Sequence, residues 1–497
     1  MIKNLLTKKP FVRVAPNYSL WSYESGDINS TFYDDRVNGY MVLKQSDFIR
    51  ELNISGHKIN SPIYYPNKIK YDEEKNRYFE QQVIRTAFPF QKIILTQQLI
   101  HLCGNDIHIE STSTKISEED KNATIELKKG WMDKNMEIAF YELAKSVKST
   151  GDGAIVIYMS NGKVKYKPLS FLYGDRLFPH YDQDGEIDAF VRLYVDYDED
   201  GNELTEWVEV WDDKYITRYK KDKKGLGGVI SSIKEYLGLD GFVVDMPPVM
   251  HGFNEVPIIY KRDDNGPCWS DSQDAIDKYE LAVSHLCQNN MAYAFPIMVL
   301  KGDDVTIKGD IYGDVKCITM GNEDDAKYLS PSDASQSFTV QLNTLLKMIF
   351  MGGFIVEPPE VKSGDLPGVA IKLIYSPSLE KAIVDSKEYD AAVDKLVRLF
   401  KFGYGIEIGK VTQMSNLSVF SWIDPYVHQN MSELVNNLCM LVNSGVLSKD
   451  TASSLSGYGE NNEFDKIMKE WKETQAADLL NDIKNTDGVQ TTGETTA

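Results

Sequence analysis

Residues Ser330 to Phe402 constrain the fold more than any other stretch, because two helical patterns flank a segment that a helix cannot contain. Ser330 followed by Pro331 is typical of a helix start. Apolar residues then recur at steps of three and four, which predicts one buried face. They are Phe338, Leu342, Leu345, Leu346 and Ile349. Gly352 and Gly353 end the pattern, so we expect a helix over residues 330–352.

The next segment, residues 353–368, is rich in proline and glycine and cannot continue a helix. Ser376 and Pro377 begin a second pattern, which runs for roughly seven turns until Gly403 and Gly405. Two core helices joined by an ordinary loop would show the same pattern. The stretch therefore predicts an architecture and leaves the function open.

Composition places the 497-residue chain among folded proteins of two to four domains, with 42% hydrophobic and 26% charged residues. The longest apolar patch, Met348 to Val356, is far shorter than a membrane span, and the first residues lack a signal-peptide pattern. The five cysteines are scattered and form no CxxC pair, as is typical of a reducing compartment. We expect no membrane association.

The charge balance is acidic, with 54 basic and 74 acidic residues and a formal net charge of −20. Proteins that wrap nucleic acid tightly usually carry the opposite sign. If the chain meets DNA, we expect it to do so without gripping it.

Periodicity predicts helices and strands along the rest of the chain. Helical patterns cover Tyr71–His101, Trp131–Val147 and Ser270–Phe295, and Ile107 with Ile109 alternate as in a strand. Residues 151–220 alternate as antiparallel strands, with a hairpin turn at Asn161-Gly162. Within this region we expect strands at Ile187–Tyr197 and Glu206–Tyr219.

The C-terminal part is predicted to contain a strand at Leu417–Trp422, a helix at Tyr426–Val442, and a last helix around Trp471. After Asp482 little apolar side chain remains to be buried. We therefore expect a disordered tail.

Motifs of the common enzyme classes are absent from the sequence. It contains no GxxxxGK[ST], HExxH, GxSxG or zinc-finger pattern, and no pair of carboxylates is singled out. His101, Cys103 and His108 are better explained as structural residues than as metal ligands. Asp196 to Gly201 imitates half of a calcium loop, but Trp207 replaces the bidentate glutamate. We expect no enzymatic activity, metal or cofactor.

Four segments, in this order, resemble a known family. They are Gly151–Ala154 with Pro168 and Asp175, Phe253–Ile259 followed by Ser270–Phe295, Gly368–Leu373, and Ser444–Ala452. Together they resemble the portal proteins of tailed double-stranded DNA phages, of the siphovirus type. The resemblance extends over roughly residues 79–471. It implies an α+β portal fold with an α/β wing, a two-helix stem, a small α/β clip insert, a long helix after a tunnel loop, and an α-helical crown.

The resemblance also implies a division of the chain into regions. These are the wing at 1–255 (with 1–70 unassigned), the first stem helix and its approach at 256–296, the clip at 297–329, the second stem helix at 330–352, the tunnel loop at 353–368, the long wing helix and strand at 369–423, the crown at 424–480, and the tail at 481–497.

Candidate site residues follow from these regions. The tunnel loop and DNA channel would contain Pro358, Pro359, Lys362, Gly364, Lys347 and Lys372. The clip surface that contacts terminase and adaptor would contain Lys301, Asp303, Lys308, Asp310, Tyr312 and Lys316. The crown turn would contain Gly445, Ser448 and Lys449. Lys362 is the basic residue of the proposed loop, although a solvated loop charge of no consequence is an equally good reading.

The family implies a twelve-subunit homo-oligomeric ring at one capsid vertex of the virion, assembled in the host cytoplasm. Such a ring nucleates the procapsid, docks the large terminase subunit, passes double-stranded DNA without sequence preference, and joins the head–tail adaptor. Major capsid and scaffolding proteins are further expected partners. The alternative is a non-enzymatic oligomeric scaffold or binding module unrelated to DNA translocation.

Overall fold

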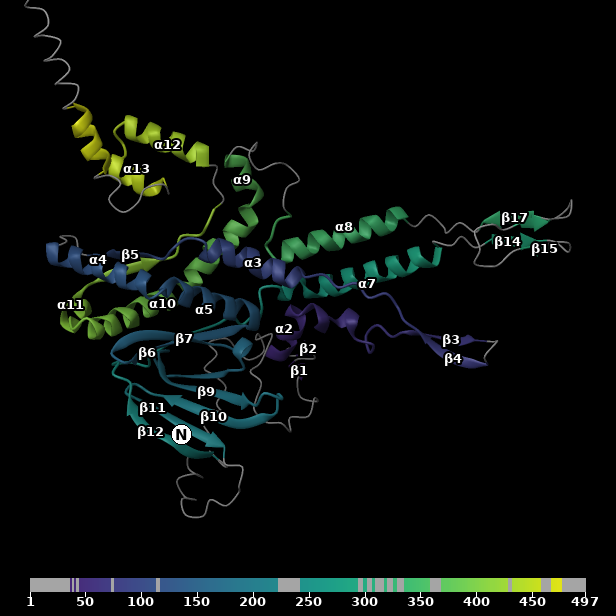
Figure 1. The fold of residues 1–497 in the computed structure, drawn as a ribbon, viewed down its shortest axis with the longest axis horizontal. Coiled ribbons are helices and arrows are strands. Elements are labelled where there is room, and N and C mark those ends of the chain that lie inside the picture. The colour runs from purple at the N-terminus through teal and green to yellow at the C-terminus, as the bar shows by residue number, and fades with distance from the viewer. Residues whose placement is uncertain are drawn as a thin grey trace, which may run out of the picture. The chain divides into compact units, whose positions relative to one another are not determined.

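The computed structural model describes residues 36–37, 40–41, 44–72, 76–112, 117–221, 242–293, 298–301, 306–308, 317–319, 325–328, 335–357, 368–427, 431–456 and 466–475 (Figure 1). The chain divides into two compact units. Unit 1 contains residues 1–357 and 377–426, and unit 2 contains residues 358–376 and 427–497.

Unit 1 contains a three-stranded antiparallel sheet in the order β13-β6-β7. Its strands are β6 (Asp152–Ser160), β7 (Lys163–Leu169) and β13 (Ile258–Arg262). Asn161 and Gly162 join β6 to β7 with φ values of 53° and 72°, as in the predicted hairpin turn. Residues 152–157 of β6 are all buried, because both faces of the strand are covered.

A five-stranded antiparallel meander covers one face of this sheet, in the order β12-β11-β10-β9-β8. Its strands are β8 (Arg176–Tyr181), β9 (Ile187–Tyr197), β10 (Glu203–Trp211), β11 (Tyr215–Lys221) and β12 (Phe242–Met250). The prediction of a strand at Ile187–Tyr197 is confirmed. The single strand predicted at Glu206–Tyr219 is wrong, because the Asp212 carboxylate accepts the backbone N–H groups of Lys214 and Tyr215 and folds a turn there.

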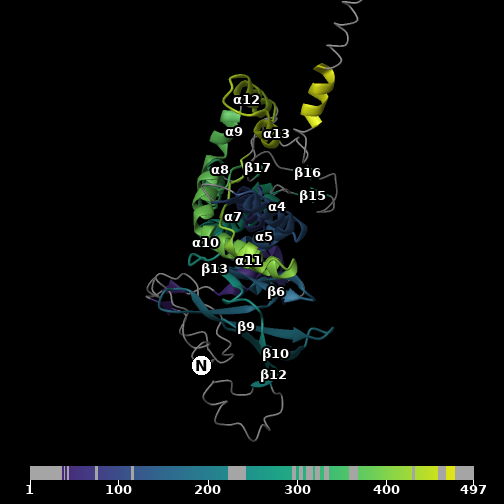
Figure 2. The ribbon, with the colours of Figure 1, turned by 90° about the vertical axis from the view of Figure 1, so that its left-hand side faces the viewer.

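Helices cover the other face of the three-stranded sheet, and both views place that sheet between the helices and the meander (Figures 1 and 2). They are α3 (Phe90–Cys103), α4 (Glu118–Asp133), α5 (Met136–Thr150), α10 (Ser376–Glu407) and α11 (Val411–Asn416). The main core lies between them. Its most deeply buried large side chains include Ile94, Leu102, Leu127, Met136, Leu143, Ile155, Ile157, Trp269 and Phe400.

Three predicted helices differ from the structure. The one predicted at Tyr426–Val442 begins later, because Tyr426 and Val427 are not helical and α12 covers Met431–Asn443. Residues 71–72 and 76–89 are not helical: β3 (Lys68–Asp72) pairs antiparallel with β4 (Arg77–Gln81), and helix α3 begins only at Phe90. The helix predicted at Trp131–Val147 is divided between α4 and α5. Asn135 causes this division, because its φ of 54° is incompatible with a continuing right-handed helix.

Short elements complete the body of unit 1. Strand β5 (His108–Ser111) pairs antiparallel with β18 (Val419–Trp422), so the two predicted strands form one sheet. The remaining elements are β1 (Arg36–Val37), β2 (Tyr40–Met41), α2 (Gln45–Leu52) and the 3-10 turns η2 (Ile54–Gly56), η3 (Lys58–Asn60) and η4 (Phe171–Tyr173).

The stem of unit 1 is a pair of helices, α7 (Ser270–Tyr293) and α8 (Ser335–Gly352), which lie side by side (Figure 1). Between them in sequence, β14 (Met298–Lys301) pairs with β17 (Asp325–Tyr328), and β15 (Thr306–Lys308) pairs with β16 (Cys317–Thr319). The described residues of the predicted clip insert are therefore all in strands.

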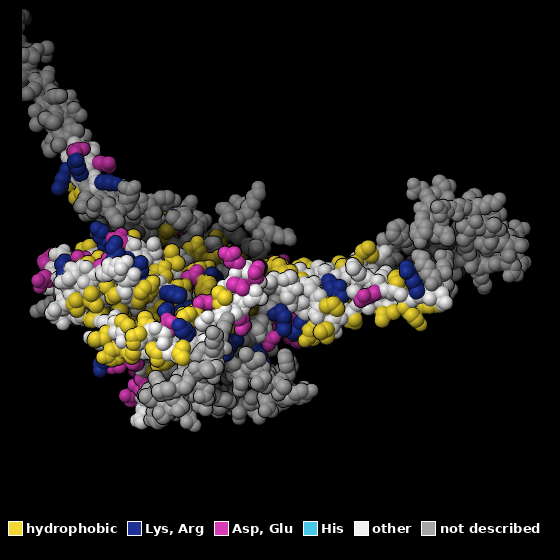
Figure 3. Space-filling view, turned by 60° about the horizontal axis from the view of Figure 1, so that its bottom comes forward, with side chains coloured by type: hydrophobic (Ala, Val, Ile, Leu, Met, Phe, Trp, Pro, Cys, Tyr) yellow, Lys and Arg dark blue, Asp and Glu magenta, His cyan; other side chains and the backbone are white. Residues whose placement is uncertain are grey.

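Unit 2 is helical in its described residues. It contains α9 (Gly368–Ile374), α12 (Met431–Asn443), α13 (Lys449–Leu455) and a helix over residues 466–475. Among the described residues of both units, every helix is too short or too polar to cross a membrane. On the face drawn in Figure 3, acidic, basic and apolar side chains are interspersed over the residues that are coloured.

Candidate functional site

The two stem helices pack through the apolar stripe that the sequence predicted. Phe338, Leu342, Leu345 and Leu346 are half-buried, and Ile349 is fully buried. Val340, Met348 and Met351 lie on the opposite side of α8 and are exposed. At the base of the stem the Ser272 hydroxyl of α7 donates to the Ile349 carbonyl of α8 at 2.9 Å. This polar contact ties the first turn of α7 to the last turn of α8.

The buried face of α7 also carries polar side chains that hold an extended segment of the body. Glu280 and Ser284 have no exposed surface. Glu280 Oε1 accepts the backbone N–H of Phe88 at 2.8 Å, and Ser284 Oγ accepts that of Thr86 at 2.9 Å. Gln288 Oε1 accepts the N–H of Ile84 at 3.1 Å. We call these three contacts the polar ladder.

The polar ladder depends on two periods that nearly coincide. Its side chains are four residues apart on a helix, a rise of about 6.0 Å, and its N–H groups are two residues apart on an extended chain, a rise of about 6.6 Å. Alternate N–H groups of an extended segment point to the same side. Ile84, Thr86 and Phe88 therefore satisfy their backbone donors without belonging to a sheet.

Helix α3 holds the residues that directly follow α8, 353–356, which we call the exit of α8. Gln98 donates from Nε2 to the Gly353 carbonyl at 2.8 Å, and Gln97 exchanges two hydrogen bonds of 3.3 Å with the backbone of Val356. A Cβ at Gly353 would lie 2.8 Å from Cγ1 of Ile94, so only glycine fits there. Phe354 turns the chain with a φ of 52°, and its carbonyl accepts the Ser378 hydroxyl of α10.

A buried ion pair orients the glutamine that holds this exit. Lys148 of α5 places its ammonium 2.9 Å from Gln98 Oε1 and 2.5 Å from Asp385 Oδ2 of α10. Because Oε1 faces a cation, the amide group of Gln98 must turn its Nε2 toward Gly353. Lys381 lies 2.7 Å from the other oxygen of Asp385. Helices α3, α5 and α10 thus jointly position the first residues of the predicted tunnel loop.

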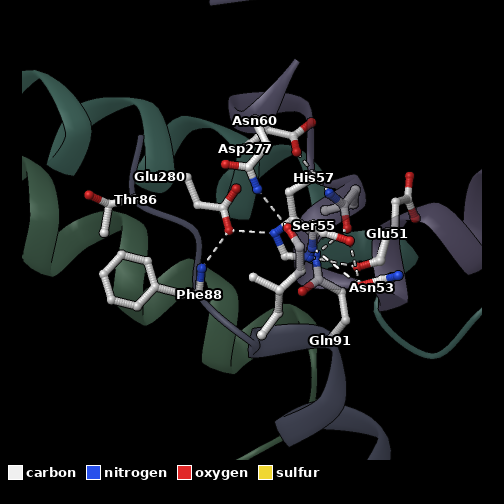
Figure 4. A network of polar contacts seen from close by, with 12 residues as sticks. Glu51, Asn53, Ser55, His57, Asn60, Thr86, Phe88, Gln91, Asp277 and Glu280 are labelled. Carbon is white, nitrogen blue, oxygen red and sulfur yellow. Dashed lines mark hydrogen bonds and ion pairs between the residues drawn. The ribbon is translucent and has the colours of Figure 1, made fainter. Parts of the chain in front are cut away.

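A second buried polar cluster joins the N-terminal part of the body to α7. Figure 4 shows His57 and Glu280 pointing toward one another, with His57 Nδ1 and Glu280 Oε1 2.7 Å apart. His57 Nε2 lies 2.8 Å from the Glu51 carbonyl oxygen, and the Trp269 indole donates to Glu51 Oε2 at 2.9 Å. Burial raises the pKa of Glu51 to about 7, with the Trp269 hydrogen bond opposing it. Burial opposes the charge of His57, but the contact with Glu280 holds its pKa above the usual value.

The predicted channel residues are only partly described. Pro358, Pro359, Lys362 and Gly364 lie outside the described residues. Lys347 is exposed on α8 and Lys372 is exposed on α9, which belongs to the other unit. Their shared role in a channel stays a prediction.

Only two of the six predicted clip residues are among the described residues. Lys301 ends β14 and Lys308 ends β15, whereas Asp303, Asp310, Tyr312 and Lys316 lie outside the described residues.

The crown turn has the local structure that its sequence predicts. Gly445 has a φ of 75°, in the left-handed region that favours glycine after a helix. Ser448 caps α13 by accepting the backbone N–H of Thr451 at 3.1 Å, and Lys449 is exposed in the first turn. The turn therefore separates α12 from α13.

Metal binding has no candidate in the described part of the chain, where no group of three or more His, Cys, Asp or Glu is suitably placed. His101 Nδ1 contacts the Tyr426 carbonyl oxygen, and the His108 ring stacks on Trp422.

The comparison with family models decides the family. Residues 56–477 match the model described as "Phage portal protein, SPP1 Gp6-like". The chain belongs to this portal family. The match begins just before His57 and includes the stem, the exit of α8 and most of unit 2. Membership supports a portal role at a capsid vertex of a virion, as part of an oligomeric ring with other phage proteins.

The other two comparisons add less. A solved structure described as "Neck of empty GTA particle computed with C6 symmetry" contains a chain that is 11% identical. The similarity has a TM-score of 0.40 and covers 76% of this portal protein and 91% of that chain. No curated protein matches.

Proposed function

We propose that the chain forms a twelve-subunit ring that conducts double-stranded DNA through the portal vertex. The observation that carries this proposal is the held exit of α8. Gln97, Gln98 and Ser378 fix the backbone of residues 353–356, the first residues of the segment 353–368 that the family resemblance assigns to the tunnel loop. A loop that meets moving DNA needs a base that does not move with it. Four hydrogen bonds from two helices provide such a base.

Net charge supports a conduit that lets DNA slide. At −20 for one chain, twelve chains carry a formal charge of −240. Each phosphate contact by a basic side chain would add affinity and slow the passage of the duplex. We expect DNA binding to be weak, dependent on salt and indifferent to sequence.

The ring would exchange partners in a fixed order, acting without catalysis. It would nucleate the procapsid with scaffolding and major capsid proteins in the host cytoplasm, and then dock the large terminase subunit. After packaging, the clip residues 297–329 would leave terminase and bind the head–tail adaptor. DNA would pass through the same ring during ejection.

Mass photometry of the purified chain, with negative-stain images of the same sample, tests this proposal. A ring with a central hole and about twelve times the mass of 56.4 kDa is the expected result. A stable compact dimer would contradict it, because two equal faces cannot close such a ring. If the chain alone stays monomeric, co-expression with its scaffolding protein must yield rings, and monomers in that sample would also contradict the proposal.

Lys362 offers a test of the channel itself. In assembled rings, Lys362→Ala is expected to leave ring mass unchanged and to alter the amount of DNA packaged. Lys128→Ala, at an exposed position of α4 outside the candidate site residues, is the matched control. Equal packaging by both variants would remove Lys362 from the proposed channel.

A further inference from the structure

His57 makes two contacts that a neutral imidazole cannot make together. The residue lies between η2 and η3, and only 4% of its surface is exposed. Its Nδ1 faces a carboxylate oxygen of Glu280, and its Nε2 faces the carbonyl oxygen of Glu51. A neutral imidazole has one N–H donor, whereas the imidazolium has two. The geometry therefore requires the charged ring.

Glu280 is the poorer place for this proton. Its Oε1, which faces His57, also accepts the backbone N–H of Phe88 at 2.8 Å. A carboxylate oxygen accepts two hydrogen bonds readily, whereas the hydroxyl oxygen of a protonated carboxyl is a weak acceptor. The contact is thus a buried imidazolium–carboxylate pair, whose two side chains are 2% and 1% exposed.

The charged groups around the ring come from three elements. Helix α7 presents Glu280 and Asp277, and η3 presents Lys58, whose ammonium lies 2.5 Å from Asp277. Helix α2 presents Glu51 and, further away, Asp47. The extended segment before α3 contributes the backbone N–H of Phe88. Lys58 is itself paired, and Glu51, with a pKa of about 7, is neutral at mildly acidic pH and acts on His57 through its carbonyl oxygen. The remaining groups, Glu280 and Asp277 above all, are acidic and favour a protonated His57.

We propose that His57 is a protonation-controlled latch that fastens residues 44–60 to the base of the stem helix α7. When the imidazole of His57 is charged, both of its hydrogen bonds form and Glu280 has its counterion. When the ring loses a proton, one nitrogen becomes an acceptor facing another acceptor, and Glu280 is left as a buried carboxylate without a cation. Because Glu280 also forms one contact of the polar ladder, opening the latch loosens the hold of α7 on Phe88.

The sign of the pH dependence follows from the contacts. His57 has its pKa raised above its usual value, so the latch is closed at mildly acidic pH and opens as the pH rises through that pKa. Between about 6.5, the pKa of free histidine, and this raised pKa, the closed-to-open ratio falls by about tenfold per pH unit, because opening releases one proton; above the raised pKa the ratio levels off.

Two mass-spectrometric measurements test the latch on the full chain. Exchange of the imidazole C2 hydrogen, followed from about pH 5 to about pH 10, reports the pKa of His57 in its own peptide. Amide exchange, corrected for the intrinsic effect of pH, reports the opening of residues 44–60 and 84–88. We expect both to change with one midpoint above about 6.5, the value of free histidine. A midpoint at or below that value, or flat amide exchange, would overturn the proposal.

Three variants separate the latch from its neighbours. Glu280→Gln keeps an acceptor for Phe88 and removes the counterion, so the midpoint should fall by at least about one pH unit. Asp188→Asn is the matched control, because His180 and Asp188 form an exposed pair of the same kind. Glu51→Gln should keep the pH-dependent change in amide exchange. If this change disappears in Glu51→Gln and persists in Glu280→Gln, ionisation of Glu51 causes it and the proposal is wrong. Should Glu280→Gln not fold, the wild-type midpoints still decide the question.

Discussion

The ammonium of Lys148 and the carboxylate of Asp385 lie 2.5 Å apart between helices α5 and α10, with both side chains buried. The pair is not symmetrical. Asp385 has a second cation, Lys381, whereas among the described residues the ammonium of Lys148 has, besides Asp385, only the neutral oxygen of Gln98. Removing one partner or the other should therefore have unequal effects.

Asp385→Leu leaves a buried ammonium without a counterion, and such a loss typically costs about 3–5 kcal/mol. For a chain of this size we expect the melting temperature to fall by about 5 °C. Lys148→Met leaves Asp385 paired with Lys381 and should lower it less. Differential scanning calorimetry of both variants checks the order. Equal losses would mean that Lys381 does not compensate.

The close approach of Gly353 to Ile94 predicts a strong local effect of one methyl group. A Cβ at residue 353 would meet two carbons of the Ile94 side chain within 3 Å. Ile94 is fully buried and cannot move aside, so Gly353→Ala should cost about 1–3 kcal/mol. Adding Ile94→Ala removes the clashing atoms, and the double variant should lose less than the sum of the two single variants. Strict additivity in thermal unfolding would show that the approach is looser than described.

The pKa of Glu51 predicts a stability that declines toward alkaline pH. Burial raises this pKa from 4.5 to about 7, so the contribution of Glu51 is complete below 4.5 and is lost as the pH rises through about 7. Glu51→Gln keeps an acceptor for Trp269 without the charge. At about pH 8 the variant should be more stable than wild type by up to about 3 kcal/mol, and the two should converge near pH 4.5. Melting curves at both pH values check this, and a constant difference between them would contradict it.

The polar ladder predicts a localised effect of Ser284→Ala. The variant leaves the half-buried backbone N–H of Thr86 without its acceptor, which costs about 1 kcal/mol. Amide exchange should accelerate at Thr86 and much less at Ile84 and Phe88, which have their own acceptors. Ser448→Ala, which removes an exposed helix cap in the other unit, should leave all three amides unchanged.

Much of the secondary structure was predictable from local patterns. The apolar stripe of α8 gave its buried face, and Asn161-Gly162 gave the β6–β7 hairpin. The errors occurred where local chemistry competes with periodicity. Asn135 interrupts a continuous helical pattern by adopting a left-handed conformation, and Asp212 divides a continuous strand pattern with side-chain hydrogen bonds.

The residues that hold the stem could not be found from the sequence. Glu280, Ser284 and Gln288 resemble the solvent-facing residues of any amphipathic helix, and their partners are backbone groups about 200 positions away. His57 and Lys148 likewise have no local signal, because each is paired with a residue more than 200 positions distant. One hint was present: the four-residue spacing of polar side chains on α7 matches a helix face.

The two periods of the polar ladder fix the register between residues 84–88 and helix α7. The helix advances about 6.0 Å for each rung and the extended segment about 6.6 Å, so the mismatch grows to about 1.8 Å by a fourth rung, too much for a well-formed hydrogen bond. Three rungs are thus near the natural limit of such a contact. Deleting a single residue from the segment would turn every following N–H to the wrong side, whereas a change of two residues would restore the phase. Length variation should therefore be tolerated in steps of two residues in the extended segment and four in the helix.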